Sequence, residues 1–267
     1  MTVNIVEAMT DPALLGNSFG EDTREAWRAV LSGAFALPMN AERQATFKHL
    51  AGGRTEPQSR VREVWAIAGR RSDKTHTAAG IAVYIAAIGA ELDGTLSRLT
   101  AGERGVVAIL AVDRPQARVA LSYVRGLLED SPMLAPMIEA AKGESITLTN
   151  GVSIEVATNN HRNVRGRTLL ACILDETAFF KDETSVSPDT EVYRALLPSL
   201  ATTGGLLVGI SSPYAKRGLL YNKWRRHYGK DDDDVLVVQG GTLDFNPTID
   251  RRVIEEAEID DPQSAQA

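Results

Sequence analysis

The chain has 267 residues, of which 43% are hydrophobic and 24% charged, and its formal net charge is −6. This length suffices for one large α/β domain with a buried core. The acidic balance argues against a protein that coats DNA statically, but it does not exclude brief contact with phosphates through a local basic patch. No run approaches the roughly 20 uncharged apolar residues of a membrane span, and the start of the chain lacks the pattern of a signal peptide. The single cysteine, Cys172, fits a reducing compartment and a core position.

Residues 1–57 are predicted to be helical with loops, and to form a segment that covers the domain like a lid. Thr23 is expected to cap a helix that has Trp27 and Leu31 on its apolar face. A second helix is expected over residues 41–50.

From residue 64 onward, strands alternate with helices, which predicts a mostly parallel sheet covered by helices on both faces. Asn150-Gly151 between two short apolar runs predicts a hairpin. We assign residues 58–250 to this core. Strands are predicted over residues 64–68, 105–112, 145–148, 152–156, 169–174, 206–210 and 235–239, and helices over residues 74–90, 115–129 and 218–228.

A phosphate-binding loop is predicted directly after the first of these strands. Its residues are Gly69, Arg70, Arg71, Ser72, Asp73, Lys74 and Thr75. Backbone N–H groups, the positive end of the following helix and the lysine would together hold phosphates. Lys74 would reach the β- and γ-phosphates of ATP, and Thr75 would bind Mg²⁺. The alternative for this segment alone is an ordinary basic turn between a strand and a helix.

Two positions of this loop depart from the usual phosphate-loop pattern. Ala68 and Asp73 stand where glycines are usual. The carboxylate of Asp73 beside phosphates is electrostatically unfavourable, although aspartate tolerates the turn conformations that most residues avoid.

Two further strand ends carry polar side chains. Asp175 and Glu176 follow the apolar strand 169–174, and Ser211, Ser212 and Pro213 follow another. Because the carboxyl ends of parallel strands meet at one edge of a sheet, these groups are expected near the loop. Asp175 would bind Mg²⁺, and Glu176 would polarise the attacking water. Taken singly, the acids could cap a helix and the serines could end a strand in a simple turn.

Several arginines are candidates for stabilising a phosphoryl transition state. Guanidinium groups suit both that charge and the phosphates of DNA, and a solvated basic loop is the alternative. The candidates are Arg162, Arg165 and Arg167 before the acidic strand, together with Arg70 and Arg71 in the loop. For a further basic stretch a solvated helix face is favoured over DNA contact, and it comprises Lys216, Arg217, Lys223, Arg225 and Arg226.

Taken in order, these motifs resemble the large terminase subunits of tailed bacteriophages and prophages over nearly the whole chain. The ordered set is far more specific than any one part. It consists of the loop at 69–75, Gly102-Glu103-Arg104-Gly105, Gln116-Ala117, Asn150-Gly151-Val152, Val164-Arg165-Gly166-Arg167, Leu174-Asp175-Glu176 with Ala178-Phe179-Phe180, Ser211-Ser212-Pro213-Tyr214 and Asn246-Pro247-Thr248.

The resemblance implies a P-loop ATPase fold of the ASCE type, in which an extra strand lies between the two Walker strands. That strand would carry Ser211, Ser212 and Pro213 as the coupling motif, and Glu176 would be the catalytic base. ATP and Mg²⁺ would be the cofactors. An arginine finger would come from the loop (Arg70 or Arg71) or from a neighbouring subunit (Arg165 or Arg167). Gln44 and Gln58 are candidate donors to adenine.

The resemblance also implies an ATPase motor that drives double-stranded DNA into a procapsid, in the cytoplasm of an infected or lysogenic bacterial host. Its partners would be the portal protein and the small terminase subunit. It would act as a homo-oligomeric ring on the capsid, be monomeric when isolated, and have no membrane association. Residues 251–267 would lead toward a C-terminal nuclease domain, so no DNA cleavage is expected from this chain.

Two alternatives remain open. Asp73 in the loop suggests a nucleotide-binding or assembly module with impaired turnover. Another P-loop motor, such as a helicase, is disfavoured by the ordered motif set and by residues 246–248.

Overall fold

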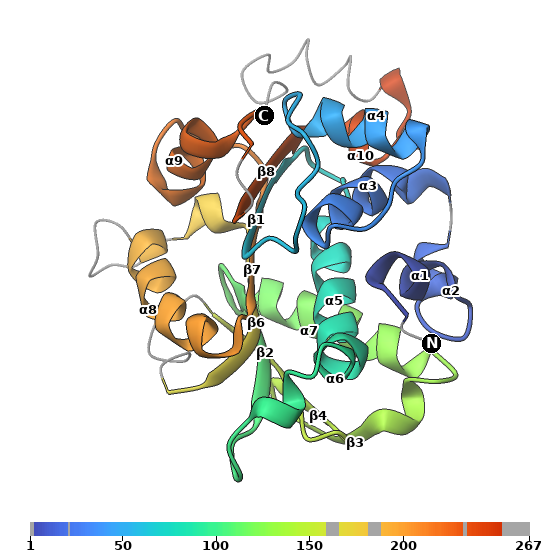
Figure 1. The fold of residues 1–267 in the computed structure, drawn as a ribbon, viewed down its shortest axis with the longest axis vertical. Coiled ribbons are helices and arrows are strands. Elements are labelled where there is room, and N and C mark those ends of the chain that lie inside the picture. Colours follow the sequence, from blue (N-terminus) through green and yellow to red (C-terminus); the bar gives the residue numbers. More distant parts are fainter. Residues whose placement is uncertain (1–2, 21, 159–165, 181–187, 232–233, 253–267) are drawn as a thin grey trace.

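An eight-stranded sheet forms the centre of the molecule (Figure 1). The structure is a computed structural model that describes residues 3–20, 22–158, 166–180, 188–231 and 234–252. Arg162, Arg165 and most of the segment 251–267 lie outside these residues.

The strands follow in space the order β3-β4-β5-β2-β6-β7-β1-β8. The six strands from β5 to β8 pair in parallel, and β3 and β4 extend the β5 edge as antiparallel strands. Their bounds are β1 Glu63–Ala68, β2 Gly105–Ala111, β3 Ile138–Lys142, β4 Ser145–Leu148, β5 Ser153–Thr158, β6 Thr168–Asp175, β7 Leu206–Ser211 and β8 Val235–Gly240.

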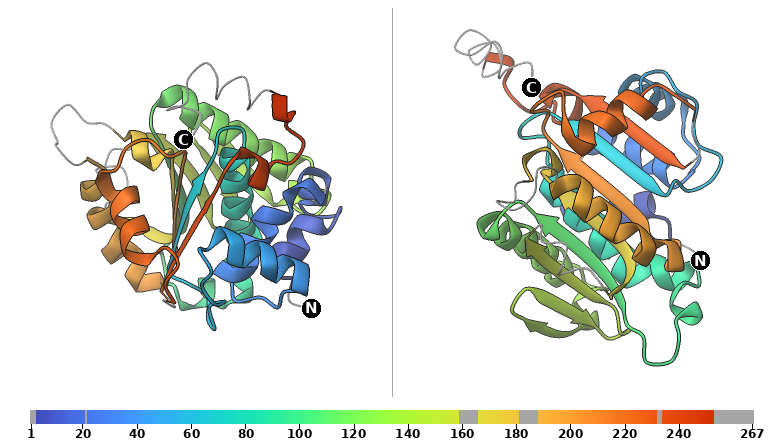
Figure 2. Two further views of the ribbon diagram at one scale, coloured as in Figure 1. Left: turned by 90° about the horizontal axis from the view of Figure 1, so that it is seen from above. Right: turned by 90° about the vertical axis from the view of Figure 1, so that its left-hand side faces the viewer.

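Helices cover both faces of this sheet (Figures 1 and 2). In the right-hand view of Figure 2, α8 and α9 lie in front of the sheet, while α3, α5 and α7 lie behind it. The helices are α1 Ile5–Thr10, α2 Gly16–Phe19, α3 Glu25–Ala34, α4 Ala41–Leu50, α5 Lys74–Tyr84, α6 Ala90–Leu92, α7 Arg114–Glu129, α8 Pro188–Thr203, α9 Gly218–His227 and α10 Thr242–Phe245.

The central strands are buried along their whole length because both faces are covered. Every residue of β2 and β7 is buried, as expected for apolar runs in a parallel sheet. Cys172 lies in the core as predicted, and burial strongly raises the pKa of its thiol. The mostly parallel α/β sheet is therefore confirmed, and β7 lies between β6 and β1 as the ASCE arrangement requires.

The hairpin at Asn150-Gly151 is also confirmed. β4 and β5 pair antiparallel, and Gly151 has a φ of +83°. The side chain of Asn150 accepts from Val152 N at 3.1 Å and donates to Ala86 O at 2.9 Å. It therefore also links the turn to the helical segment that follows α5.

Four local features differ from the sequence prediction. Thr23 does not cap α3, because it lies within a 3₁₀ turn, Asp22–Arg24, and Arg24 occupies the N-cap position. The helix predicted over 74–90 is interrupted by a π-helical turn, Ile85–Gly89. The strand β3 and the helix α8 were not predicted, since the β3 sequence Ile-Glu-Ala-Ala-Lys has only one of the β-branched and aromatic residues typical of strands and α8 contains Pro198.

The helical stretch Lys74–Leu92 is long and apolar enough to cross a membrane by length and composition alone. However, 67% of its most apolar window is buried inside the protein. We therefore interpret it as a buried core helix that packs against the sheet.

Gly209 in β7 gives a test of how tightly the central strands pack. A Cβ at this position would lie 2.3 Å from ring carbons of Trp65, which is fully buried. We expect Gly209→Ala to lower the free energy of unfolding by about 1–3 kcal/mol, because the indole ring would have to move. The control is Gly126→Ala in α7, where a Cβ meets no atom within 4 Å. The Gly126→Ala change should raise the free energy of unfolding by about 0.5–1 kcal/mol. Urea unfolding measures both variants. An equal loss of stability in the two would contradict the tight packing inferred at Gly209.

Candidate nucleotide-binding site

A cavity of about 410 Å³ opens beside the phosphate loop, at the edge where β1, β6 and β7 end. Residues 71–76 of the loop and the start of α5 line it, together with Glu176 after β6 and Tyr123 of α7. Residues 245 and 246 close another side. The loop and the acidic strand end, 100 residues apart between Thr75 and Asp175, are thus brought together.

The loop has the shape expected of a phosphate cradle. Arg71 and Asp73 have φ values of 59° and 63°, in the left-handed region. Gly69 packs so closely on α10 that a Cβ would lie 2.5 Å from Thr242 N. Asp73 therefore adopts the backbone conformation for which glycine is usual, as its tolerance of turn geometry predicted.

Side chains from other parts of the chain hold three consecutive carbonyls of the loop. In a trans peptide the next N–H points away from the carbonyl, so these contacts also orient the amide groups of the loop. Thr242 Oγ1 donates to Arg70 O at 2.9 Å, Asn246 Nδ2 donates to Arg71 O at 3.0 Å, and Trp27 Nε1 donates to Ser72 O at 2.7 Å.

Lys74 is buried in the middle of the site. Its Nζ donates to Gly69 O at 2.9 Å and to Ser212 Oγ at 3.0 Å, and it lies 3.8 Å from Glu176 Oε1. Burial lowers the pKa of this amine, while the charges of Glu176 and Asp175 oppose the shift. The lysine thus connects the loop with Glu176 after β6 and with Ser212 after β7.

Asp175 and Thr75 offer oxygens suited to a hard cation. Thr75 Oγ1 donates to Asp175 Oδ2 at 2.8 Å, and Asp175 is 1% exposed. Its Oδ1 is buried and has no hydrogen-bond partner among the described residues. The described residues contain no group of three or more His, Cys, Asp or Glu side chains that could hold a metal ion, so a cation here would use few protein ligands. One carboxylate and one hydroxyl fit Mg²⁺, which keeps several waters and binds phosphates.

Metal-free protein should show the cost of this buried carboxylate. Burial raises the pKa of Asp175 to about 6, and the charge of Glu176 adds to the shift. The pKa of Asp175 is higher in the folded state than in the unfolded state, so the neutral carboxyl stabilises the fold relative to the charged form. This contribution to the free energy of unfolding is fully present below about pH 4 and is lost as the pH rises through about 6.

We therefore expect Asp175→Asn to raise the free energy of unfolding in EDTA at pH 8 by roughly 1–2 kcal/mol, because the variant carries no charge there. Mg²⁺ with ATP should stabilise the unchanged protein and not the variant. Urea unfolding measures both effects, with Asp130→Asn on the surface as the control. Lower stability of Asp175→Asn in EDTA would show that the charge is not the dominant cost.

Glu176 is presented to the cavity by strained backbone. Its φ is 56°, which is uncommon for a side chain of this size. Its Oε2 accepts from Ser211 Oγ and from Ser212 N, both at 3.1 Å. Ser211 Oγ also accepts from Ala178 N at 3.2 Å. The strand ends that were predicted to meet therefore contact one another directly, and Pro213 follows them and lines a separate cavity.

The candidate arginines occupy different places. Arg70 and Arg71 are both exposed in the loop, and of the two Arg71 lines the cavity. Arg167 precedes β6 and pairs with Glu155 at 3.2 Å, so about 26 Å of strand separates it from Asp175. It does not reach the site of its own subunit.

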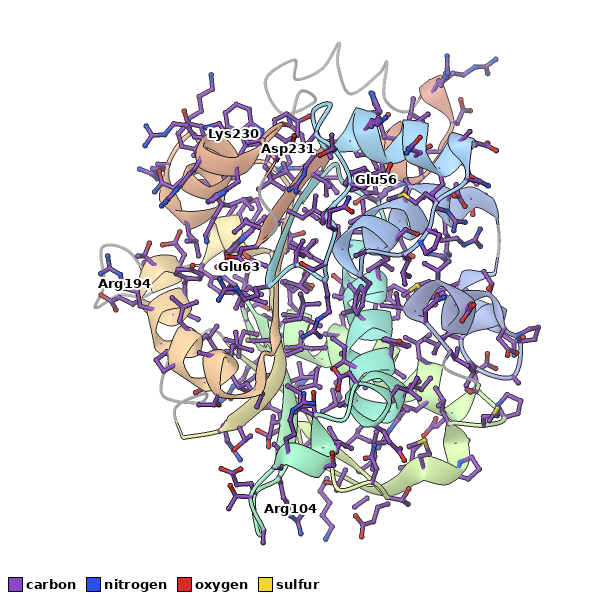
Figure 3. All side chains as sticks on the ribbon, in the orientation of Figure 1. Glu56, Glu63, Arg104, Arg194, Lys230 and Asp231 are labelled. Carbon is purple, nitrogen blue, oxygen red and sulfur yellow. The ribbon has the colours of Figure 1, made fainter. Side chains whose placement is uncertain are left out.

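Two other groups of candidates lie away from the cavity. Lys223 was expected on a solvated face, but that expectation is wrong: its amine pairs with Glu63 and donates to Tyr193 Oη at 2.8 Å, and its side chain is only 13% exposed. Figure 3 labels Glu63, which lies between the sheet and the helices α8 and α9. Gln44 donates to the side chain of Glu56 and Gln58 to its carbonyl, and neither glutamine lines the cavity.

The groups that surround Asp73 were not predicted from the sequence. Arg24 forms an ion pair with Asp73 Oδ2, and His76 Nδ1 lies 3.1 Å from the same oxygen. Burial lowers the pKa of His76 to about 4, and the charge of Arg24 adds to the shift. The three-residue spacing of Asp73 and His76 on a helix was a usable signal, whereas nothing in the sequence indicates that Arg24 lies beside the loop.

No family model matches the chain, and no curated protein matches it in sequence. Solved structures do match. The HK97 bacteriophage large terminase has a TM-score of 0.60 at 15% identity, over 89% of this chain and 52% of that one. The large terminase ATPase domain of Thermus phage P74-26 has a TM-score of 0.55 at 21% identity, over 81% and 92%. A large terminase from a thermophilic bacteriophage has a TM-score of 0.53 at 10% identity, over 88% and 49%.

This chain thus spans about half the length of the first and third of these proteins. At such identities the likeness concerns the fold. Together with the sheet order, it shows that the chain has the fold of phage large terminase ATPase domains, which is a P-loop NTPase fold.

Proposed function

We propose that this chain is the ATPase motor domain of a phage large terminase, and that it hydrolyses ATP to move double-stranded DNA into a procapsid. The observation that carries the proposal is the meeting of Lys74, Asp175 and Glu176 at one sheet edge, in contact with Ser211 and Ser212. A P-loop NTPase needs a phosphate-binding amine, an oxygen site for Mg²⁺ and a group that activates water, and each has a candidate here.

The contacts support a division of roles among the residues. Lys74 would exchange its bonds to Gly69 O and Ser212 Oγ for oxygens of the β- and γ-phosphates. Thr75 and Asp175 would hold Mg²⁺, which would neutralise phosphate charge. Glu176 would orient the attacking water and accept its proton.

The serines would couple the site to the rest of the domain. Ser212 contacts Lys74, and Ser211 contacts Glu176. Loss of the γ-phosphate would alter both contacts, and the change would pass into the segment that follows β7.

Arg71 is the candidate finger within the chain, because it lines the cavity. Arg167 lies away from this cavity and would act only on the site of a neighbouring subunit in a ring. Arg165, which lies outside the described residues, is the other candidate for that role. In the host cytoplasm, the motor domain would have as partners the portal protein, the small terminase subunit and double-stranded DNA.

An assembly module without turnover is the second candidate, and Asp73 is the observation that favours it. We prefer the motor because Arg24 and His76 engage the Asp73 carboxylate.

The test is ATP hydrolysis by the purified chain with Mg²⁺, alone and with linear double-stranded DNA. We expect slow hydrolysis that increases with DNA and with protein concentration, as subunits assemble. ATP binding without hydrolysis under every condition would support the assembly module instead. Separation of a forked duplex would support a helicase.

A further inference from the structure

The phosphate loop carries its own negative charge at Asp73. This residue is 26% exposed in its side chain and lines the cavity between Ser72 and Lys74. A unit charge about 6 Å from a phosphate, at an effective dielectric constant of about 20, would weaken ATP binding about a hundredfold. A working site needs a cation that offsets this carboxylate.

Arg24 is placed to supply that cation. Its guanidinium pairs with Asp73 Oδ2 and also lines the cavity. It stacks over the ring of Phe19 at 5.3 Å, and the same ring stacks on His76 at 4.4 Å with an interplanar angle of 11°. His76 in turn makes the second contact to Asp73 Oδ2. Phe19 therefore supports both groups that hold the carboxylate.

The helix that follows Arg24 also shapes the loop. Arg24 is the N-cap of α3, and Trp27, three residues later, donates to Ser72 O at 2.7 Å. Trp27 packs on Phe245 at 4.6 Å, on the other side of the loop. The position of the guanidinium is thus set by the same helix that holds the backbone beside Asp73.

We propose that Arg24 is a positioning residue for the triphosphate: it neutralises and restrains the Asp73 carboxylate, so that a loop with aspartate in a glycine position binds a nucleoside triphosphate with Mg²⁺. The inference rests on the proposed function, because it presumes that the loop binds ATP. It predicts that the need for Arg24 disappears when the charge of Asp73 is removed.

The experiment is a double-mutant cycle on the full chain, with the Kd for Mg²⁺ and ATP measured by calorimetry. The variants are Arg24→Gln, Asp73→Asn and the double variant. Asparagine is nearly isosteric with aspartate and tolerates the left-handed conformation. Arg43→Gln is the matched control, since Arg43 lies in the same N-terminal region but pairs with Glu25 at 2.5 Å.

We expect Arg24→Gln to weaken binding by about tenfold or more. Asp73→Asn should bind at least as tightly as the unchanged protein, and the double variant should differ from Asp73→Asn by less than about threefold. Arg24→Lys should retain most of the affinity, and Arg43→Gln should retain all of it. Circular dichroism melting of each variant shows that it is folded.

Three results would overturn the proposal. An equal loss from Arg24→Gln in both backgrounds would mean that Arg24 contacts the nucleotide directly or only supports the fold. An unchanged Kd in Arg24→Gln would mean that the carboxylate needs no neutralisation, while the proposed ATPase would stand. Binding by Asp73→Asn but not by the unchanged protein would show that Arg24 does not suffice. Absence of binding in every variant would instead contradict the proposed function itself.

Discussion

Lys74→Ala is expected to weaken binding of ATP by about a hundredfold or more, because the variant loses the one amine that reaches into the site from the loop. The amine now donates to Gly69 O and Ser212 Oγ and lies near Glu176. All three groups are acceptors, so they hold the amine in place for phosphate oxygens. Titration of a fluorescent ATP analogue in the presence of Mg²⁺ measures the effect.

The control for this change is Lys48→Ala, which removes an exposed lysine of α4. It should bind the analogue with unchanged affinity. If Lys74→Ala binds within about threefold of the unchanged protein, the nucleotide does not occupy the phosphate loop, and the assignment of the site fails.

Glu176→Gln is expected to slow ATP hydrolysis by roughly a thousandfold and to leave ATP binding nearly unchanged. The amide oxygen can still accept from Ser211 Oγ and Ser212 N, so the contacts between β6 and β7 remain. What the variant loses is the ability to accept a proton from water. Release of phosphate and binding of the analogue, measured on the same preparation, separate the two effects.

A matched control is Glu129→Gln, which changes an exposed glutamate at the end of α7. Its hydrolysis rate should be unchanged. Hydrolysis by Glu176→Gln within tenfold of the original rate would mean that another group activates the water, and Asp175 would then be the next residue to test.

Much of the fold was predictable because the sequence alternates apolar runs with amphipathic helices. An uninterrupted apolar run such as 169–174 is most stable as a central strand of a sheet that helices cover on both faces. Once the strands are parallel, their carboxyl ends meet, so Lys74, Asp175 and Ser211 were expected at one edge before any contact was known. The position of β7 between β6 and β1 came from the resemblance, since alternation alone does not give strand order.

The environment of the site was less predictable, because it depends on long-range packing. Arg24 lies 49 residues from Asp73 in the chain, and no periodic pattern relates the two. Lys223 was expected to be solvated, yet its amine lies against Glu63 and over the ring of Tyr193 at 4.5 Å. Such pairings form when helices pack on the sheet, and local sequence propensities do not predict them.

The three side chains that hold the carbonyls of the phosphate loop come from both sides of the core in the sequence. Trp27 precedes the first strand, and Thr242 and Asn246 follow the last one. A gene fragment that encodes only residues 58–240 would therefore contain the phosphate loop, the acidic pair and the serines, yet it would lack every one of these donors. The shape of the loop thus depends on residues that precede the first strand and follow the last one. The segment that contains the recognisable motifs is therefore not a minimal ATP-binding unit.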